Sequence, residues 1–135
     1  KGFEACASAV EGLDIVMTLG ANGTNTAHLI EIAGEIERVA ERHPRSKIAM
    51  ISRPPDDARS QADIETAWDQ LGRISKRPVI FQTYGTSKTP TPTVDVIVRL
   101  AKKHPHAFGY VKECEEASHE NRVRGMGRLA VAFAA

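Results

Sequence analysis

Four short runs of apolar or β-branched residues recur along the chain about 30 residues apart, which is the length of one βα unit. The runs are Asp14–Leu19, Lys47–Ser52, Pro78–Thr83 and Ala107–Lys112. Each is short enough for a buried strand and is bounded by turn-forming or charged residues. Strands that alternate with segments of this length predict an α/β fold with parallel strand pairing.

The segments between these runs have the period of amphipathic helices. In the best-marked segment, Thr26–Arg42, the apolar side chains fall on one stripe; Asn25 or Thr26 can cap its start, and Pro44 prevents its continuation. The predicted helices are Phe3–Val10, Thr26–Arg42, Ala62–Ser75, a helix that begins at Thr91-Pro92 and ends at Lys102-Lys103, and Glu116–Phe133.

The 135 residues contain no linker rich in Pro, Gly or Ser, so we expect residues 1–135 to form a single domain. Two architectures fit the alternation. One is a (β/α)8 TIM barrel of which about four βα units are present, and the other is a small open doubly wound parallel sheet. The length of the chain favours the open sheet, whereas the residues at the strand ends favour the barrel.

The charge of the chain is nearly balanced, with 18 Lys and Arg against 17 Asp and Glu. A net charge of +1 provides no general field for nucleic acid or an anionic membrane. No apolar run approaches the roughly 18 residues that span a bilayer, so we expect a soluble, cytoplasmic protein. Cys6 and Cys114 lie outside any metal-binding or disulfide pattern and are predicted to be small buried residues.

Ligands bind at the carboxyl ends of the strands in both architectures. The loop Gly20–Asn25 is either a tight turn with a helix cap or an anion site at a helix N-terminus. In the second loop, Arg53 can hold an anion and the aspartates can cap a helix, although a solvated loop is the favoured interpretation. The third loop, Gln82–Lys88, includes Tyr84, a phenol that can donate a proton.

Lys112 is the most distinctive residue, because it ends a strand that is expected to be buried. Strand alternation places it on the same face as Phe108 and Tyr110. Desolvation is expected to lower the pKa of such a lysine and to favour the neutral amine, which attacks a ketone to form a Schiff base. A solvated lysine at a strand end is the structural alternative.

The chain between Leu13 and Ala117 resembles the central part of the dihydrodipicolinate synthase and N-acetylneuraminate lyase family, class I aldolases built on a (β/α)8 barrel. The resemblance is carried by LGANGTNTAHLIEIA from Leu19, RPVIFQTYG from Arg77, TPTVDVIVRLAKKHP from Thr91 and FGYVKE from Phe108. It implies that Lys112 forms an imine with the keto group of pyruvate or a related 2-oxo acid. It also implies a homo-oligomer and requires no metal or diffusible cofactor.

The sequence departs from the family pattern at several positions. Gln82 stands where the family carries a proton-relaying tyrosine, and a glutamine cannot act as a general acid. Tyr84 is the alternative catalytic proton donor, while Gln82 and Asn22 are expected to bind substrate oxygens. SRPPDD stands where the family has its second tyrosine element. Lys88 falls near the position at which the family often has a substrate-binding arginine. The family's GTTGE-like element is absent from this sequence.

The resulting hypothesis is a Schiff-base-forming lyase or synthase that cleaves or forms a C–C bond next to the carbonyl of a 2-oxo acid. The alternative is a noncatalytic family member or fragment that binds a 2-oxo acid or acts as a scaffold. A flavodoxin-like nucleotide-binding sheet is a third interpretation, without a P-loop or a dinucleotide fingerprint.

Overall fold

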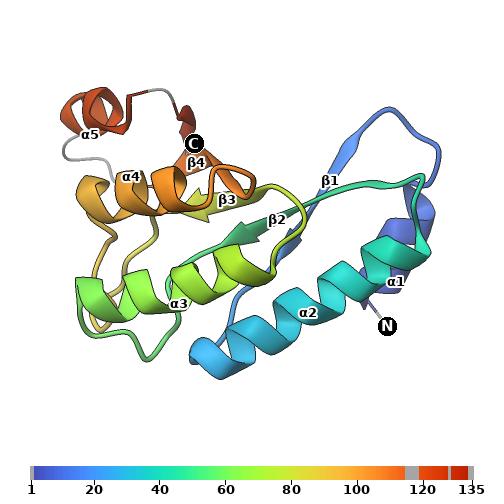
Figure 1. The fold of residues 1–135 in the computed structure, drawn as a ribbon, viewed down its shortest axis with the longest axis horizontal. Coiled ribbons are helices and arrows are strands. Elements are labelled where there is room, and N and C mark those ends of the chain that lie inside the picture. Colours follow the sequence, from blue (N-terminus) through green and yellow to red (C-terminus); the bar gives the residue numbers. More distant parts are fainter. Residues whose placement is uncertain (1, 115–118, 128, 134–135) are drawn as a thin grey trace.

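The computed structural model describes residues 2–114, 119–127 and 129–133 (Figure 1). The elements are α1 (Gly2–Ala9), β1 (Val16–Gly20), α2 (Thr26–Arg42), β2 (Lys47–Ser52), α3 (Gln61–Ile74), β3 (Val79–Gln82), α4 (Val94–Lys103), β4 (Phe108–Glu113), α5 (His119–Met126) and β5 (Ala130–Phe133). Within these ranges, no helix is long and apolar enough to cross a lipid bilayer.

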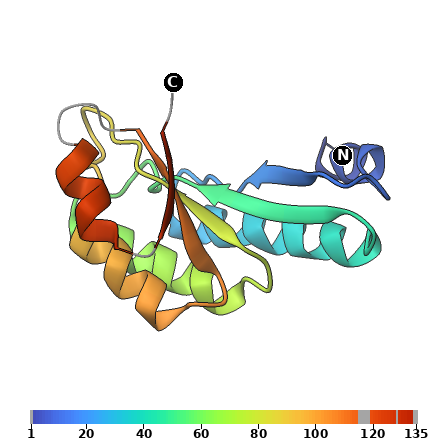
Figure 2. The same ribbon diagram turned by 90° about the horizontal axis from the view of Figure 1, so that it is seen from above.

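The strands form one parallel sheet in the order β1-β2-β3-β4-β5. Figure 2 shows α2, α3 and α4 together beneath this sheet. A sequential strand order with the helices on one side is the arrangement in part of a (β/α)8 barrel. A doubly wound sheet instead has helices on both faces and a reversal in strand order. The barrel prediction is therefore confirmed, and the doubly wound and flavodoxin-like alternatives are wrong.

The core lies between the sheet and the helices, because alternate strand side chains point to the helix side. Met50 of β2 and Phe81 of β3 are fully buried there. Trp68 of α3 lies against Phe81, with ring centroids 4.7 Å apart. The indole Nε1 of Trp68 also donates a hydrogen bond to Ser52 Oγ at 3.2 Å. The strand residues that alternate with these face the inner surface of the barrel segment.

A β-bulge at Gly109 changes this alternation in β4. Phe108 and Tyr110 pair with successive residues of β3, so Gly109 is the extra residue. Phe108 stacks on Phe81 in the core, with centroids 4.3 Å apart, whereas Tyr110 is 50% exposed. Phe108 therefore faces the helices, and its predicted common face with Lys112 is wrong because the bulge intervenes. Tyr110 and Lys112 alternate regularly and share the inner face.

Three helix starts are set by capping side chains. Asn25 caps α2 by accepting from His28 N at 2.9 Å, as predicted. Ser60 and Asp63 form a reciprocal capping box that begins α3, so the aspartates of the preceding loop, the less favoured interpretation, do not cap it. Thr93, and not Thr91, caps α4.

The late start of α4 has its cause in a contact with α3. The Gln61 side chain donates to Thr91 O and accepts from Thr93 N, both at 2.8 Å. These bonds hold the segment before α4 against α3.

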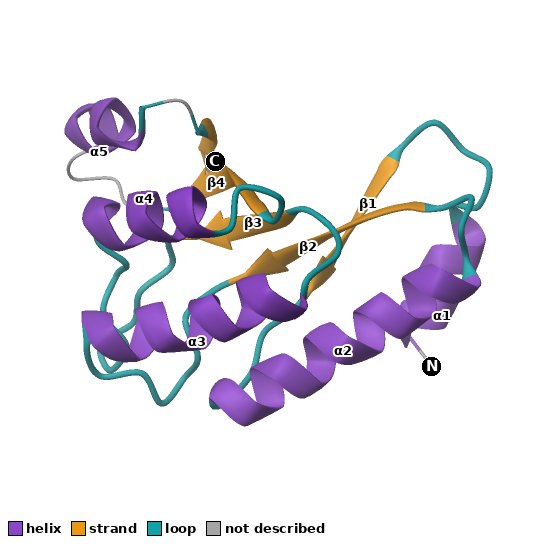
Figure 3. Cartoon of the chain, viewed as in Figure 1, coloured by secondary structure: helices purple, strands orange, loops and turns teal. Residues whose placement is uncertain are grey.

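The predicted helix Glu116–Phe133 is wrong in its second half. Helix α5 ends at Met126, and Gly127 follows with φ of +62°, a backbone conformation that favours glycine. The run after it forms β5, which pairs in parallel with β4 (Figure 3). Residues 116–118 of the prediction lie outside the described ranges. The chain thus contributes a fifth strand to the barrel segment.

Candidate active site

The predicted site residues gather at the edge where the parallel strands end. Asn22 follows β1, Gln82 ends β3, Tyr84 follows two residues later, and Lys112 is the penultimate residue of β4. In barrels of this type the carboxyl ends of the strands carry the ligand site.

The structure brings Gln82 and Lys112 together. They are Cα partners in the ladder between β3 and β4. Their neighbours Phe81 and Val111 are buried on the helix side, so Gln82 and Lys112 extend to the inner face. Both side chains are half-buried, and Gln82 Nε2 lies 3.9 Å from the Sγ of Cys114. A lysine and a glutamine are therefore direct neighbours on the inner face of the sheet.

Tyr84 lies outside β3 and is 49% exposed. Thr83, between Gln82 and Tyr84, is fully buried on the helix side. The phenol projects from the loop instead of standing on the strand beside Lys112. Its role as proton donor stays a prediction.

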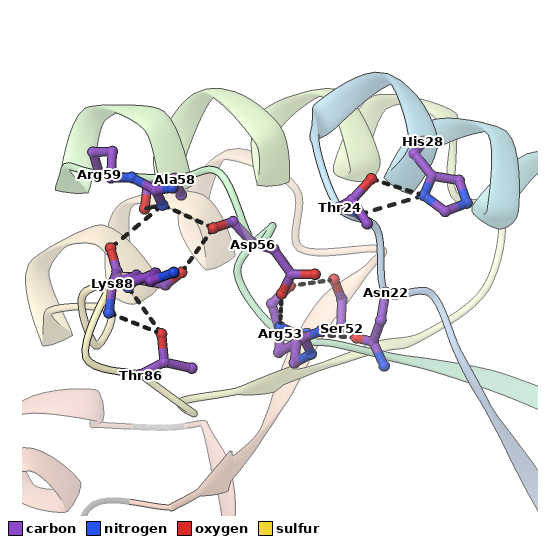
Figure 4. Close-up of polar contacts among 11 residues, drawn as sticks. Asn22, Thr24, His28, Ser52, Arg53, Asp56, Ala58, Arg59, Thr86 and Lys88 are labelled. Carbon is purple, nitrogen blue, oxygen red and sulfur yellow. Dashed lines mark hydrogen bonds and ion pairs between the residues drawn. The ribbon is translucent and has the colours of Figure 1, made fainter.

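Asn22 joins the first two loops. Its Oδ1 accepts a hydrogen bond from Arg53 N at 3.0 Å (Figure 4). Arg53 Nη1 in turn pairs with Asp56 Oδ1 at 2.5 Å, and this guanidinium lowers the pKa of the Asp56 carboxyl below its ordinary value. Because the carbonyl oxygen of Asn22 has a structural partner, its amide NH2 is the group that can bind a substrate oxygen. Arg53, for which an anion ligand was the less favoured interpretation, holds a carboxylate of its own loop.

The loop after β1 has the contacts of a capped turn. The backbone N–H groups of Asp56 and Asp57 donate to Gly23 O at 3.2 Å and Thr24 O at 3.0 Å. A Cβ on Gly23 would lie 2.3 Å from Leu29 N, so this close approach requires glycine. These contacts favour the turn interpretation over an anion site.

Arg59 joins the second and third loops, a role that the sequence did not indicate. Its Nη1 donates to Asp56 O at 2.8 Å, Ala58 O at 3.0 Å and Lys88 O at 3.4 Å (Figure 4). Lys88 itself is exposed, and its N–H donates to Thr86 Oγ1 at 3.1 Å. The loops that follow β2 and β3 thus form one connected rim around the inner face.

A buried polar network stands directly behind Lys112. Thr83 Oγ1 donates to Glu113 Oε1 at 2.6 Å and accepts from Cys114 N at 2.8 Å. Glu113 is completely buried, and its Oε2 accepts from Arg122 Nε of α5 at 3.0 Å. Sequence reasoning missed Thr83, Glu113 and Arg122. Glu113 was missed because a charged residue just after a predicted strand usually indicates solvent, and the other two because their partners lie in distant segments. The expectation that both cysteines are buried is also wrong, because Cys6 and Cys114 are partly exposed.

No protein-family model and no curated protein matches this sequence. Several solved structures do match. Dihydrodipicolinate synthase from Thermotoga maritima superposes with a TM-score of 0.79 at 11% identity, over 98% of this chain and 45% of that one. The fold is that of part of a dihydrodipicolinate synthase barrel. The family resemblance expected from the sequence is thereby confirmed at the level of the fold.

Two further structures agree with this result. A prophage protein of the dihydrodipicolinic acid synthase family from E. coli K12, solved in complex with pyruvate, gives a TM-score of 0.76 at 16% identity, over 98% of this chain and 45% of that one. The 4-hydroxy-tetrahydrodipicolinate synthase of Methylacidiphilum fumariolicum SolV gives 0.74 at 18% identity, over 98% and 43%. The chain thus spans less than half the length of these proteins.

Proposed function

We propose that this chain supplies the Schiff-base lysine of a lyase or synthase that acts on pyruvate or a related 2-oxo acid. The observation that carries the proposal is the pairing of Lys112 with Gln82 on the inner face, at the carboxyl end of a barrel strand. The pyruvate complex of a prophage protein with the same fold supports the substrate class.

The chemistry follows from an amine at that position. The Nζ of Lys112 adds to the keto carbon, and the resulting carbinolamine loses water to give an iminium ion. The iminium accepts the electron pair of a bond to the adjacent carbon, so a C–C bond can break there, or form in the reverse direction. The imine is finally hydrolysed. No metal or diffusible cofactor takes part.

The neighbouring side chains bind and orient the substrate. The amide of Gln82 donates a hydrogen bond to a substrate oxygen beside Lys112, and the NH2 of Asn22 does so from the end of β1. Neither amide transfers a proton, so proton transfer is assigned to Tyr84. This requires the loop after β3 to bring the phenol over the inner face.

Activity belongs to a barrel that further strands complete. Val16 on β1 is 64% exposed and Tyr110 on the inner face is 50% exposed, whereas a closed barrel packs such side chains. In this proposal, residues 1–135 belong to a single domain, the barrel, of which they form one part. The complete protein is a homo-oligomer in the cytoplasm.

A noncatalytic 2-oxo acid-binding or scaffold module is the second candidate. The amide of Gln82 beside Lys112, together with the 49% exposure of Tyr84, favours it. Such a module binds the 2-oxo acid without moving protons at the adjacent carbon.

Exchange of the pyruvate methyl hydrogens in D2O, followed by NMR, separates the two candidates. An enzyme that forms the iminium and its enamine exchanges them, and Lys112→Ala abolishes this exchange. Lys47→Ala is the matched control, because Lys47 lies at the amino end of β2, away from the carboxyl ends of the strands that carry the candidate site, and pairs with Asp14. Full exchange by Lys112→Ala contradicts the proposal, and binding without exchange favours the module.

A further inference from the structure

The buried network behind Lys112 holds the ends of β3 and β4 in a fixed relation. The backbone N–H of Thr83 donates to Lys112 O at 3.1 Å, which extends the ladder one residue beyond the pair of Gln82 and Lys112. The hydroxyl of Thr83 then contacts both residues that follow the lysine, Glu113 and Cys114. Thr83, the residue after β3, therefore binds three consecutive residues at the end of β4, Lys112, Glu113 and Cys114.

The pairing of Glu113 with Arg122 makes the contact between Thr83 and Glu113 costly to rearrange. A fully buried carboxylate is tolerated when a cation and hydrogen bonds offset its desolvation. Arg122 supplies that cation to Glu113, and Arg122 Nη2 also donates to Pro92 O at 2.9 Å. Arg122 of α5 thus holds the Glu113 carboxylate and is itself fixed to the segment before α4. The other oxygen of this carboxylate is the nearer acceptor for the Thr83 hydroxyl, at 2.6 Å against 3.4 Å for Lys112 O.

The network lies on the helix side, away from the face that carries Lys112. Thr83 and Glu113 are completely buried, and Lys112 stands on the alternate face of β4. The network therefore acts on the lysine through the backbone of β4 and touches no substrate. Its geometry determines where the amine stands relative to Gln82.

We infer that Thr83 is a positioning residue, which places the Lys112 amine for attack on the keto carbon by binding Glu113 and the Cys114 amide. This inference rests on the proposed function and deepens it. A displacement of about 1 Å in a reacting group is enough to slow a reaction by up to about a hundredfold.

Thr83→Val removes the hydroxyl and keeps the shape of the side chain. We expect it to lower the rate constant for borohydride trapping of pyruvate on Lys112 on the order of tenfold, at saturating pyruvate. Thr83→Ser keeps the hydroxyl and restores the rate to within about twofold. Equal trapping rates in the wild type and Thr83→Val overturn the inference.

Ser52→Ala controls for loss of stability alone. Ser52 is also a completely buried hydroxyl near the end of a strand, but its partners are Trp68 and Arg53 O. Its loss is expected to lower the free energy of unfolding and to leave the trapping rate unchanged. If Ser52→Ala slows trapping as much as Thr83→Val, the effect is general destabilisation and the inference fails. If Thr83→Val does not fold, Glu113→Gln replaces it with the same expectation.

A second reagent separates this inference from the proposed function. Formaldehyde with borohydride methylates any accessible amine, and peptide mapping gives the rate at Lys112 and at Lys47 separately. We expect Thr83→Val to change the Lys112 rate and its pH profile while the Lys47 rate stays constant. Failure of pyruvate to label the wild type contradicts the proposed function, whereas an unchanged formaldehyde rate at Lys112 contradicts the positioning role.

Discussion

Asp69 of α3 accepts a hydrogen bond from His104 at the end of α4, with 2.7 Å between Oδ1 and Nε2. Lys103 Nζ and Arg73 Nη2 also lie 2.7 Å from this carboxylate. The Asp69 and His104 side chains are only 16% and 9% exposed. The contact therefore joins two adjacent helices at a largely buried position.

Replacing Asp69 with Asn is expected to destabilise the protein by about 1–3 kcal/mol, because it leaves the buried His104 ring with a weaker partner. Urea denaturation at pH 7 measures the change. Asp14→Asn is the control, since Asp14 is 94% exposed and its ion pair with Lys47 is expected to contribute less than about 1 kcal/mol. Equal effects of the two variants would contradict this account.

Acid should weaken the contacts of Asp69 with His104 and Lys103. The Lys103 ammonium and the His104 ring lower the pKa of Asp69 below its ordinary value. A lowered pKa gives a contribution that is fully present above the unfolded value, near 3.9, and is lost as the pH falls further. Urea midpoints between pH 6 and pH 2 should therefore fall more steeply for the wild type than for Asp69→Asn. Parallel pH profiles would exclude this role.

At the contact of α1 and α2, the ion pairs of His43 should give stability the opposite pH dependence, with a loss as the pH rises. Its ring nitrogens lie 2.8 Å from Glu4 Oε1 and 3.3 Å from Glu11 Oε2, and these carboxylates raise the pKa of His43. The contribution is fully present below about pH 6.5 and is lost as the pH rises through the folded-state pKa. The wild type should lose stability between pH 6 and pH 8.5, and His43→Gln should lose less. A variant that keeps the full wild-type loss would show that His43 is not its source.

Two glycines in helices, Gly72 in α3 and Gly34 in α2, differ in the space around them and so predict opposite effects of an alanine on stability. A Cβ on Gly72 would lie 2.6 Å from His104 Cδ2 and 2.8 Å from Phe108 Cε2, both in buried side chains. Gly72→Ala should therefore cost about 1–3 kcal/mol. On Gly34 the nearest atom is Arg38 Nη1 at 3.5 Å, so Gly34→Ala should stabilise α2 by about 0.5–1 kcal/mol. Thermal denaturation of both variants checks the opposite signs.

In the 135-residue chain by itself, without the strands that complete the barrel, the edge at β1 predicts self-association. Val16 is 64% exposed at the start of this edge strand, and exposed apolar edges pair with other chains. Sedimentation velocity should show association that rises with concentration and that Val16→Lys reduces. Ile74→Lys, at an exposed apolar residue on the end of α3, should leave it unchanged.

Local signals in the sequence account for most of the elements. Asn25 and Pro44 bracket α2, and its predicted range matches the structure. Features that depend on another part of the chain were missed. Gln61 of α3 delays the start of α4, and the bulge at Gly109 turns Phe108 to the helices. Neither contact leaves a periodic signal in its own segment.

In the candidate site, too, the residues with local signals were predicted, and those that depend on distant segments were missed. The identity and position of Lys112 and Gln82 follow from strand ends, which are local, and the parallel register then makes them partners. The network behind them joins β3, β4 and α5, so no single segment indicates it. Glu113 in particular has the sequence context of a solvated residue and is completely buried.

Trapping with pyruvate and borohydride tests the central claim most directly. The protein, with its barrel completed by the further strands, is incubated with both reagents, its intact mass is measured, and the modified peptide is mapped. We predict one pyruvate-derived adduct, located on Lys112 and absent from Lys112→Ala. A folded, completed barrel that gains no adduct, or gains it equally on surface lysines such as Lys47, would contradict the assignment of Lys112 as the Schiff-base lysine.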